Sequence, residues 1–259
     1  MNRIQDRLAA LATRKEKALA LFLTAGYPTL NATAPLVHML EAAGADLIEL
    51  GMPFSDPLAD GPTIQASSSV ALKNGVTLST ILSQVQEIRR SSSIPIVLMG
   101  YVNPVLRFGA EKFFREAGES GVDGMIFPEL PLEESGRFKS VLDEHGLANI
   151  LLVAPTSPPV RIKAIDEASS GFVYCVSTTG VTGSSAPPSP VYLEGVKQHV
   201  RKNPLLVGFG ISSPEDAQTY SRHADGVIVG SALIKRLEGG VPPSELAQWV
   251  RSLKNAMNP

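Results

Sequence analysis

Short apolar segments recur along the chain, and none of them alternates strictly with polar residues. Eight such segments lie at residues 18–24, 46–50, 94–100, 123–127, 149–153, 172–177, 205–208 and 225–229. Continuous apolar runs of this length are typical of parallel strands that are covered on both faces. The stretches between them carry apolar residues at helical spacing, as at Leu36, Leu40 and Ala43. The pattern therefore predicts eight strand–helix units.

Eight strand–helix units in about 250 residues favour a (β/α)8 barrel, the TIM barrel of the α/β class. A doubly wound open sheet is the alternative, but it usually has fewer strands, and the chain lacks the Gly-x-Gly-x-x-Gly fingerprint. No Pro-, Gly- or Ser-rich linker divides the sequence, so we expect residues 1–259 to form a single TIM-barrel domain.

Two additions to the basic barrel are expected. The charged N-terminal segment predicts an extra helix before the first strand. The gap after the second strand holds a proline-rich loop, residues 52–62, and about two helices' worth of sequence. Because the loops after barrel strands build the active face, this enlarged loop is a place to look for chemistry.

The composition excludes several classes of protein. Of the 259 residues, 44% are hydrophobic and 19% are charged, a balance that rules out disorder for most of the chain. The net charge of -2 argues against nucleic acid or an anionic membrane as the main partner. The apolar runs are too short for a transmembrane helix, and the N-terminus lacks the apolar region of a signal peptide. We therefore expect a cytoplasmic protein.

An acidic residue, Glu49, lies near the end of the second apolar segment. Burying a carboxylate there is costly unless it is paired or neutralised. A structural ion pair is the alternative, but the eight segments contain no Lys or Arg. Because the carboxyl end of a barrel strand opens on the active face, a catalytic role is favoured.

Two aspartates, Asp56 and Asp60, follow in the enlarged loop. For Asp56, a structural role in a turn or cap and a role in the chemistry are equally favoured. Asp60 precedes Gly61 and Pro62, so it suits the cap of the next helix as well as a carboxylate that works with Glu49. Spacing alone leaves both interpretations open.

Glycines follow the last three predicted strands, in the segments 180–183, 208–212 and 230–232. Glycine lets backbone N–H groups approach an anion, and barrels commonly bind phosphate with these loops and a helix N-terminus. Ordinary strand-ending turns are the alternative. Phosphate binding is favoured because several such segments gather at the end of the chain.

Few other residues carry a chemical signal. The four histidines lack metal-ligand spacing, and the single cysteine, Cys175, fits a small core residue. The aromatic residues Phe22, Tyr174 and Phe209 end predicted strands, where the core is the default interpretation and a pocket wall for a flat apolar ligand is the alternative.

One long segment, residues 47–65 (LIELGMPFSDPLADGPTIQ), resembles the signature of the tryptophan synthase alpha chain family. The resemblance covers nearly the whole chain. It extends to residues 22–28 (FLTAGYP), 101–104 (YVNP), 128–131 (PELP), 177–183 (STTGVTG), 208–212 (GFGIS) and 229–232 (VGSA).

The resemblance implies a lyase of tryptophan biosynthesis. Its reaction is the retro-aldol cleavage of indoleglycerol phosphate to indole and glyceraldehyde phosphate. Glu49 matches the acid–base residue of the family, which protonates the indole ring carbon and handles the proton of the glycerol hydroxyl. Asp60 matches the second catalytic acid, which holds the indole N–H and stabilises the developing positive charge. Such a mechanism suits a partly buried glutamate with a raised pKa.

The resemblance also implies binding residues. Positions that line the indole pocket are matched by Phe22, Tyr174, Thr182 and Phe209. Positions of the phosphate site are matched by Gly183, Gly210, Gly230 and Ser231. Residues 178 to about 190 match a lid that closes over the substrate.

A partner is implied as well. The family works as an alpha-beta-beta-alpha heterotetramer in which the beta chain holds pyridoxal phosphate and receives indole through a tunnel. No cofactor is expected in this chain. Two positions depart from the family: Glu129 stands where Asp is usual, at a site that faces the beta chain, and Thr178-Thr179 lacks an arginine found in some members.

Two alternative functions remain. A sugar-phosphate isomerase or epimerase would need a different acid–base pair, and often a metal or a lysine at the mouth of the barrel. A non-catalytic subunit that only activates its partner would not need both Glu49 and Asp60.

Overall fold

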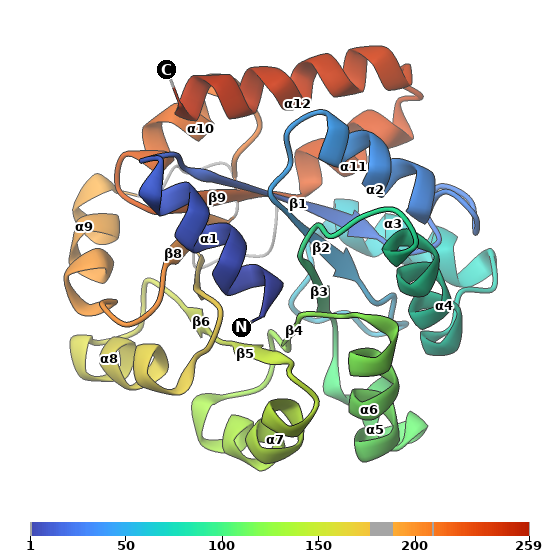
Figure 1. Ribbon diagram of the computed structural model, residues 1–259, viewed down its shortest axis with the longest axis horizontal. Coiled ribbons are helices and arrows are strands. Elements are labelled where there is room, and N and C mark those ends of the chain that lie inside the picture. Colours follow the sequence, from blue (N-terminus) through green and yellow to red (C-terminus); the bar gives the residue numbers. More distant parts are fainter. Residues whose placement is uncertain (1, 177–188, 209, 259) are drawn as a thin grey trace.

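The structure, a computed structural model, consists of parallel strands surrounded by helices (Figure 1). It describes residues 2–176, 189–208 and 210–258. The strands form one sheet in the order β5-β4-β3-β2-β1-β9-β8-β7-β6. Their bounds are β1 (Ala18–Thr24), β2 (Leu47–Gly51), β3 (Ile96–Met99), β4 (Gly124–Ile126), β5 (Ala148–Ile150), β6 (Leu152–Val153), β7 (Val173–Val176), β8 (Leu205–Gly208) and β9 (Gly226–Val229).

The sheet closes through the fifth predicted strand, which is interrupted at Leu151. Its first part, β5, pairs with β4, whereas its second part, β6, pairs with β7. The carbonyl of Leu151 accepts a hydrogen bond from the N–H of Tyr174 at 3.0 Å, so pairing passes from one neighbour to the other at this residue. The predicted (β/α)8 barrel is therefore confirmed, with one expected strand divided in two.

Helices cover the outside of the barrel. They are α1 (Arg3–Thr13), α2 (Thr33–Ala42), α3 (Pro62–Lys73), α4 (Leu78–Arg89), α5 (Val102–Phe108), α6 (Ala110–Ser120), α7 (Leu132–Glu144), α8 (Pro159–Ala168), α9 (Pro190–His199), α10 (Pro214–Ser221), α11 (Ser231–Glu238) and α12 (Pro243–Met257). The two helices α3 and α4 fill the long interval between β2 and β3, as the sequence predicts. None of the helices in the described ranges combines the length and the apolar character needed to cross a membrane.

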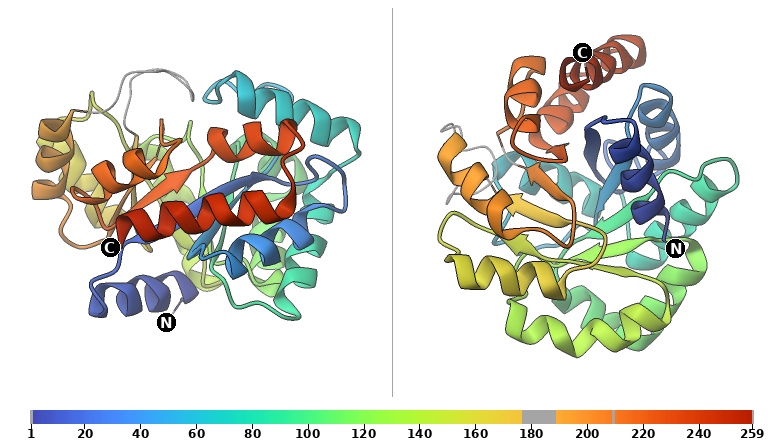
Figure 2. Two further views of the ribbon diagram at one scale, coloured as in Figure 1. Left: turned by 90° about the horizontal axis from the view of Figure 1, so that it is seen from above. Right: turned by 60° about the vertical axis from the view of Figure 1, so that its left-hand side comes forward.

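The extra N-terminal helix, α1, closes one end of the barrel (Figures 1 and 2). The helix begins with a capping box. The Asn2 side chain accepts the backbone N–H of Gln5, the third residue of the helix, and the Gln5 side chain accepts the backbone N–H of Asn2. Ile4, Leu8 and Leu11 are buried among the inward-facing residues of the strands. Since α1 seals this end, the functional face lies at the opposite, carboxyl end of the strands.

At the end of the barrel closed by α1, three aspartates make the same kind of contact. Asp46, Asp123 and Asp225 directly precede β2, β4 and β9, and each carboxylate accepts a backbone N–H of a neighbouring strand at 2.8 Å. The donors are Leu19, Ile96 and Leu205, respectively. Each of the three aspartates also pairs with at least one Lys or Arg. These contacts fix the register at which strands enter the barrel.

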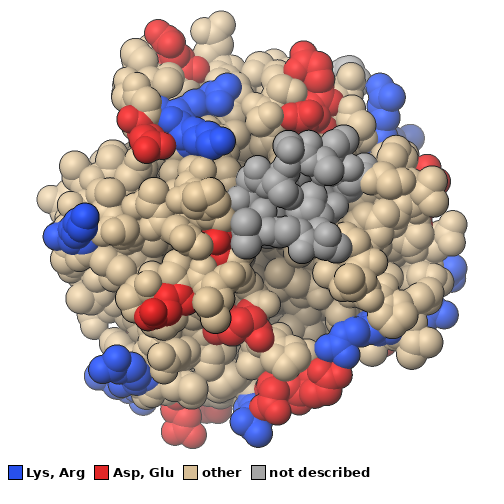
Figure 3. Space-filling view, turned by 180° about the vertical axis from the view of Figure 1, so that it is seen from behind, with Lys and Arg blue, Asp and Glu red and all other residues tan. Residues whose placement is uncertain are grey.

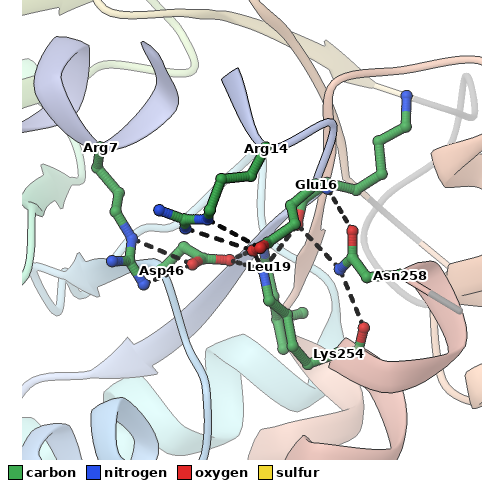
Figure 4. A network of polar contacts seen from close by, with 8 residues as sticks. Arg7, Arg14, Glu16, Leu19, Asp46, Lys254 and Asn258 are labelled. Atoms are coloured by element: carbon green, nitrogen blue, oxygen red, sulfur yellow. Dashed lines mark hydrogen bonds and ion pairs between the residues drawn. The ribbon is translucent and has the colours of Figure 1, made fainter. Parts of the chain in front are cut away.

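Asp46 joins three segments that are distant in the sequence (Figure 4). Its side chain is 1% exposed and contacts Arg7 of α1 and Lys254 of α12, both at 2.7 Å, in addition to the N–H of Leu19 in β1. A buried carboxylate satisfied in this way holds the first and last helices onto the barrel.

Candidate active site

Glu49 faces the inside of the barrel. It is the third residue of β2, and in the sheet it lies beside Phe22 of β1 and Val97 of β3. Side chains alternate along a strand, so Glu49 points to the same side as Leu47, which belongs to the cluster inside the barrel. The residue is only 1% exposed.

Among the residues that the structure describes, no cation pairs with the carboxyl group of Glu49. The atom Oε2 is buried and makes no hydrogen bond within the described residues, and the ion pairs found there do not involve Glu49. Burial raises the pKa of Glu49 to about 8, and the negative charge of Asp60 adds to the rise. The structural ion pair, the alternative interpretation of this residue, is thus not observed, and Glu49 is protonated at neutral pH.

Asp60 approaches the same site from the enlarged loop. Burial raises the pKa of Asp60 to about 6, a hydrogen bond with the Tyr101 side chain lowers it, and the charge of Glu129 raises it. Gly61, not Asp60, occupies the N-cap position of α3. The Asp60 side chain therefore lies where a second acid could act beside Glu49, and near pH 7 it is mainly ionised.

Phe22 forms a wall of this site beside Glu49. A Cβ atom added at Gly51 would lie 2.5 Å from Cζ of Phe22, and one added at Gly230 would lie 3.4 Å from its Cβ. The ring is therefore seated between the end of β2 and the turn after β9. Glycine at position 51 leaves the room that the ring occupies.

Tyr174 lies across the barrel on β7 and is 5% exposed. Its hydroxyl oxygen would be only 2.2 Å from a Cβ at Gly208, so the end of β8 must be glycine for the ring to take this place. Burial raises the pKa of Tyr174 well above its usual range, with a contribution from Glu49. The structure thus brings Phe22, Tyr174, Glu49 and Asp60 together, and their roles stay predictions.

The helices α10 and α11, which follow the last two strands, differ in whether a side chain caps the N-terminus. The carboxylate of Asp216 accepts the N–H groups of Ser212 and Ser213 at 3.0 Å, so a side chain already occupies the N-terminus of α10. At α11, which begins at Ser231, the N-cap residue Gly230 makes no side-chain cap. No side chain of the described residues therefore caps the N-terminus of α11, where an anion could bind.

Gly210 has φ +76° in the turn after β8, a conformation that favours glycine. Three other predicted site residues, Thr182, Gly183 and Phe209, lie outside the described residues, as does most of the expected lid. Where these residues lie relative to Glu49 stays a prediction.

Two neighbours of Asp60, Tyr101 and Glu129, were not predicted as site residues. Tyr101 follows Gly100 at the end of β3, and Glu129 lies shortly after β4. Their places at the carboxyl ends of strands were the signal that could have identified them.

On the face opposite α1, a few Asp and Glu side chains lie nearer the centre than the visible Lys and Arg side chains do, and other acidic side chains lie at the edge (Figure 3). Within residues 2–176, 189–208 and 210–258, no group of three or more His, Cys, Asp or Glu side chains could hold a metal ion. Helix N-termini and backbone N–H groups are thus the natural anion-binding elements of the described part of this face.

Comparison with known proteins identifies close relatives. A family model described as "Tryptophan synthase alpha chain" matches residues 8–257. The tryptophan synthase alpha chain of Geotalea daltonii is 49% identical over 260 residues, which cover 98% of each chain. That of Geotalea uraniireducens is 50% identical over 260 residues, covering 98% of this chain and 97% of the relative.

Solved structures give the same result. Tryptophan synthase subunit alpha from Legionella pneumophila has a TM-score of 0.90 at 36% identity, over 100% of this chain and 99% of that chain. A chain of tryptophan synthase from Mycobacterium tuberculosis has a TM-score of 0.92 at 37% identity, with the same coverage.

Proposed function

The chain belongs to the tryptophan synthase alpha chain family, and we propose that Glu49 and Asp60 are the residues that perform its reaction. The activity is the cleavage of indoleglycerol phosphate to indole and glyceraldehyde phosphate in tryptophan biosynthesis. The relatives do not favour the isomerase or epimerase, nor the non-catalytic subunit.

The proposed mechanism uses the opposite protonation states of the two acids. Protonated Glu49 gives its proton to the indole carbon that carries the glycerol chain, and the positive charge that develops on the ring is shared by the indole nitrogen. Ionised Asp60 accepts the indole N–H and stabilises this charge. Loss of the hydroxyl proton to Glu49 then forms the aldehyde, while the electrons of the breaking carbon–carbon bond return to the ring and release indole. One proton is given and one is recovered, so the enzyme is regenerated.

A single observation carries this proposal. Glu49 is a fully buried carboxyl group at the functional end of the barrel, has one oxygen that no described residue pairs with, and has a pKa of about 8. A structural carboxylate in such a place would be expected to have a cation or several donors. An acid whose pKa lies near the working pH is suited to proton transfer.

We propose that the substrate spans the mouth of the barrel. The indole ring would contact Phe22 and Tyr174 together with Thr182 and Phe209. The phosphate would lie at Gly183, Gly210, Gly230 and Ser231. The N-terminus of α11, which no side chain of the described residues caps, supports this direction of binding.

Ser231→Asp should weaken binding of glycerol 3-phosphate by about tenfold or more, because it places a negative charge where the phosphate would lie. The same charge at a helix N-terminus favours the helix, so thermal stability should not fall. Isothermal titration calorimetry measures the affinity. Ser231→Asn is the uncharged control, and Ser244→Asp places the same charge at the start of the distant α12. Equal affinities in all three variants would exclude α11 from the phosphate site.

We propose the beta chain as partner, in an alpha-beta-beta-alpha heterotetramer whose pyridoxal phosphate is held by the beta chain. Exposed apolar side chains near the site support a docking face, since Leu58 is 88% and Leu106 is 55% exposed. A groove of about 450 Å³ adjoins them, with Pro53, Phe54, Leu72, Leu78, Pro104 and Phe108 among its lining residues.

Purified protein should release indole from indoleglycerol phosphate slowly by itself and faster after the beta chain is added. Leu106→Asp should raise the beta-chain concentration needed for half-maximal activation, with Ser244→Asp as the charge control. Absence of indole release under both conditions would refute the function, whereas equal rates with and without the beta chain would refute the activation alone.

We further propose that residues 1–259 form one domain that works in the cytoplasm. The continuity of one sheet from β1 to β9 supports a single domain. Limited proteolysis should give no stable fragment shorter than the barrel.

A further inference from the structure

Tyr101 lies in the short turn between β3 and α5 and contacts the enlarged loop that follows β2. It is the N-cap residue of α5, is 5% exposed, and packs its ring on Phe54 with the centroids 5.3 Å apart. Phe54 belongs to the loop that carries Asp60. The tyrosine ring is therefore held against the same loop whose carboxylate enters the site.

The hydroxyl of Tyr101 contacts two successive residues of this loop. Its oxygen accepts the backbone N–H of Ala59 at 2.9 Å, and its side chain is also hydrogen-bonded to the Asp60 carboxylate. A phenol has only one proton, and the Ala59 N–H supplies its own, so the tyrosine proton is the one donated to Asp60. The backbone thereby fixes the direction in which Tyr101 donates.

Glu129 contacts the residue that follows Tyr101. Its Oε1 accepts the N–H of Val102, the first residue of α5, at 2.6 Å. Its charge opposes the ionisation of Asp60, as does burial, whereas the Tyr101 hydrogen bond favours it. The other titratable groups of the described residues that interact with Asp60 are Glu49 on β2 and Tyr174 on β7.

We propose that Tyr101 is a positioning residue for the lyase reaction: its hydroxyl, which is held in place by the Ala59 N–H and by ring packing on Phe54, orients the Asp60 carboxylate toward the indole N–H. The inference rests on the proposed role of Asp60. It assigns to Tyr101 no contact with the reacting atoms, so its effects pass through Asp60.

Two substitutions should move the pKa of Asp60 in opposite directions. Tyr101→Phe removes the hydrogen bond to the carboxylate, which should raise this pKa by about one unit. Glu129→Gln removes a negative charge but keeps an acceptor for the Val102 N–H, so the pKa should fall. Carboxyl ¹³C NMR of the full chain, with Asp60→Asn used to assign the signal, measures both shifts without requiring activity.

The same shifts should appear in catalysis. Since Asp60 must be ionised, activity is lost as the pH falls through its pKa. The acid limb of the kcat profile should move upward in Tyr101→Phe and downward in Glu129→Gln. At the pH optimum, Tyr101→Phe should lower kcat about tenfold, with KM changed less than about twofold, because the phosphate site is elsewhere.

Tyr220→Phe is the matched control, because Tyr220 is equally buried but lies in α10. This variant should leave the pKa of Asp60 and the acid limb unchanged. An unchanged Asp60 pKa in Tyr101→Phe, or shifts of the same sign in the two test variants, would overturn the inference. Absence of indole release by the unmodified chain would instead refute the proposed function, while the NMR result would still decide the role of Tyr101.

Discussion

Glu49→Gln should abolish indole release, with a loss of about 10³-fold or more, and should also make the folded chain more stable. Glutamine has nearly the same shape but gives no proton to the indole carbon and accepts none from the glycerol hydroxyl. The loss should appear in kcat, since the groups proposed to bind the indole ring and the phosphate remain. Steady-state indole release by the variant in complex with the beta chain measures it.

The gain in stability follows from the raised pKa. Glu49 has a pKa of about 8 when folded, against an ordinary value of 4.5. Between these values the folded chain keeps a proton that the unfolded chain releases, so rising pH destabilises the unmodified protein. Glutamine has no such penalty, and its advantage should grow from near zero below pH 4.5 to roughly 3 kcal/mol at pH 7.

Urea unfolding at pH 5, 7 and 8 measures this trend, with Glu87→Gln on the exposed face of α4 as the control for loss of a carboxylate. A stability difference that does not change with pH would mean that Glu49 is ionised in the folded chain. Near-normal turnover of Glu49→Gln would remove this residue from the mechanism.

The unmodified enzyme should show a bell-shaped pH dependence. The mechanism requires Asp60 ionised and Glu49 protonated, so activity should fall below about pH 6 and above about pH 8. The acid limb belongs to Asp60 and the alkaline limb to Glu49. The pH dependence of kcat for indole release measures both limbs.

Asp46→Ala should destabilise the fold by on the order of 3 kcal/mol without changing the chemistry of the site. The substitution leaves the N–H of Leu19 buried without its acceptor and removes the contacts to Arg7 and Lys254. Because this network lies at the end of the barrel closed by α1, kcat at low temperature should be retained. The midpoint of urea unfolding, followed by circular dichroism, measures the effect.

Glu16→Ala tests whether the effect is specific to the buried carboxylate. Glu16 pairs with Arg14 in the same region, but its side chain is 34% exposed, so water replaces the lost contact. The unfolding midpoint of this variant should stay nearly unchanged. Equal losses in the two variants would show that the network acts only through surface charge.

The strand pattern predicted the barrel because its strands are buried on both faces, and such strands read as continuous apolar runs. The positions at which strands begin and end were predicted less accurately. Residues 94–100 were expected in a strand that spans Ile96–Met99, and the segment 149–153 divides at Leu151. A strand extends only as far as its hydrogen bonds to neighbouring strands, and the sequence of one segment does not show which neighbour each of its residues contacts.

The residues of the site also differ in how far the sequence could identify them. Glu49 could be singled out from the sequence because an acid within an apolar run needs an explanation. The places of Tyr101 and Glu129 at the carboxyl ends of strands were visible in the sequence, but their link to Asp60 was not, because those contacts form only when β2, β3 and β4 lie side by side.

The sequence by itself therefore determined the barrel, the extra helix at its start, the enlarged loop after the second strand, and an acid near the end of that strand. These features depend on local periodicity, on turn residues and on the cost of burying a charge. Only the tertiary structure decided three other properties: that no side chain of the described residues caps the N-terminus of α11, that aromatic rings fill the space beside Gly51 and Gly208, and which groups set the pKa values of Glu49 and Asp60. Those properties depend on distances between segments far apart in the chain, and folding alone fixes such distances.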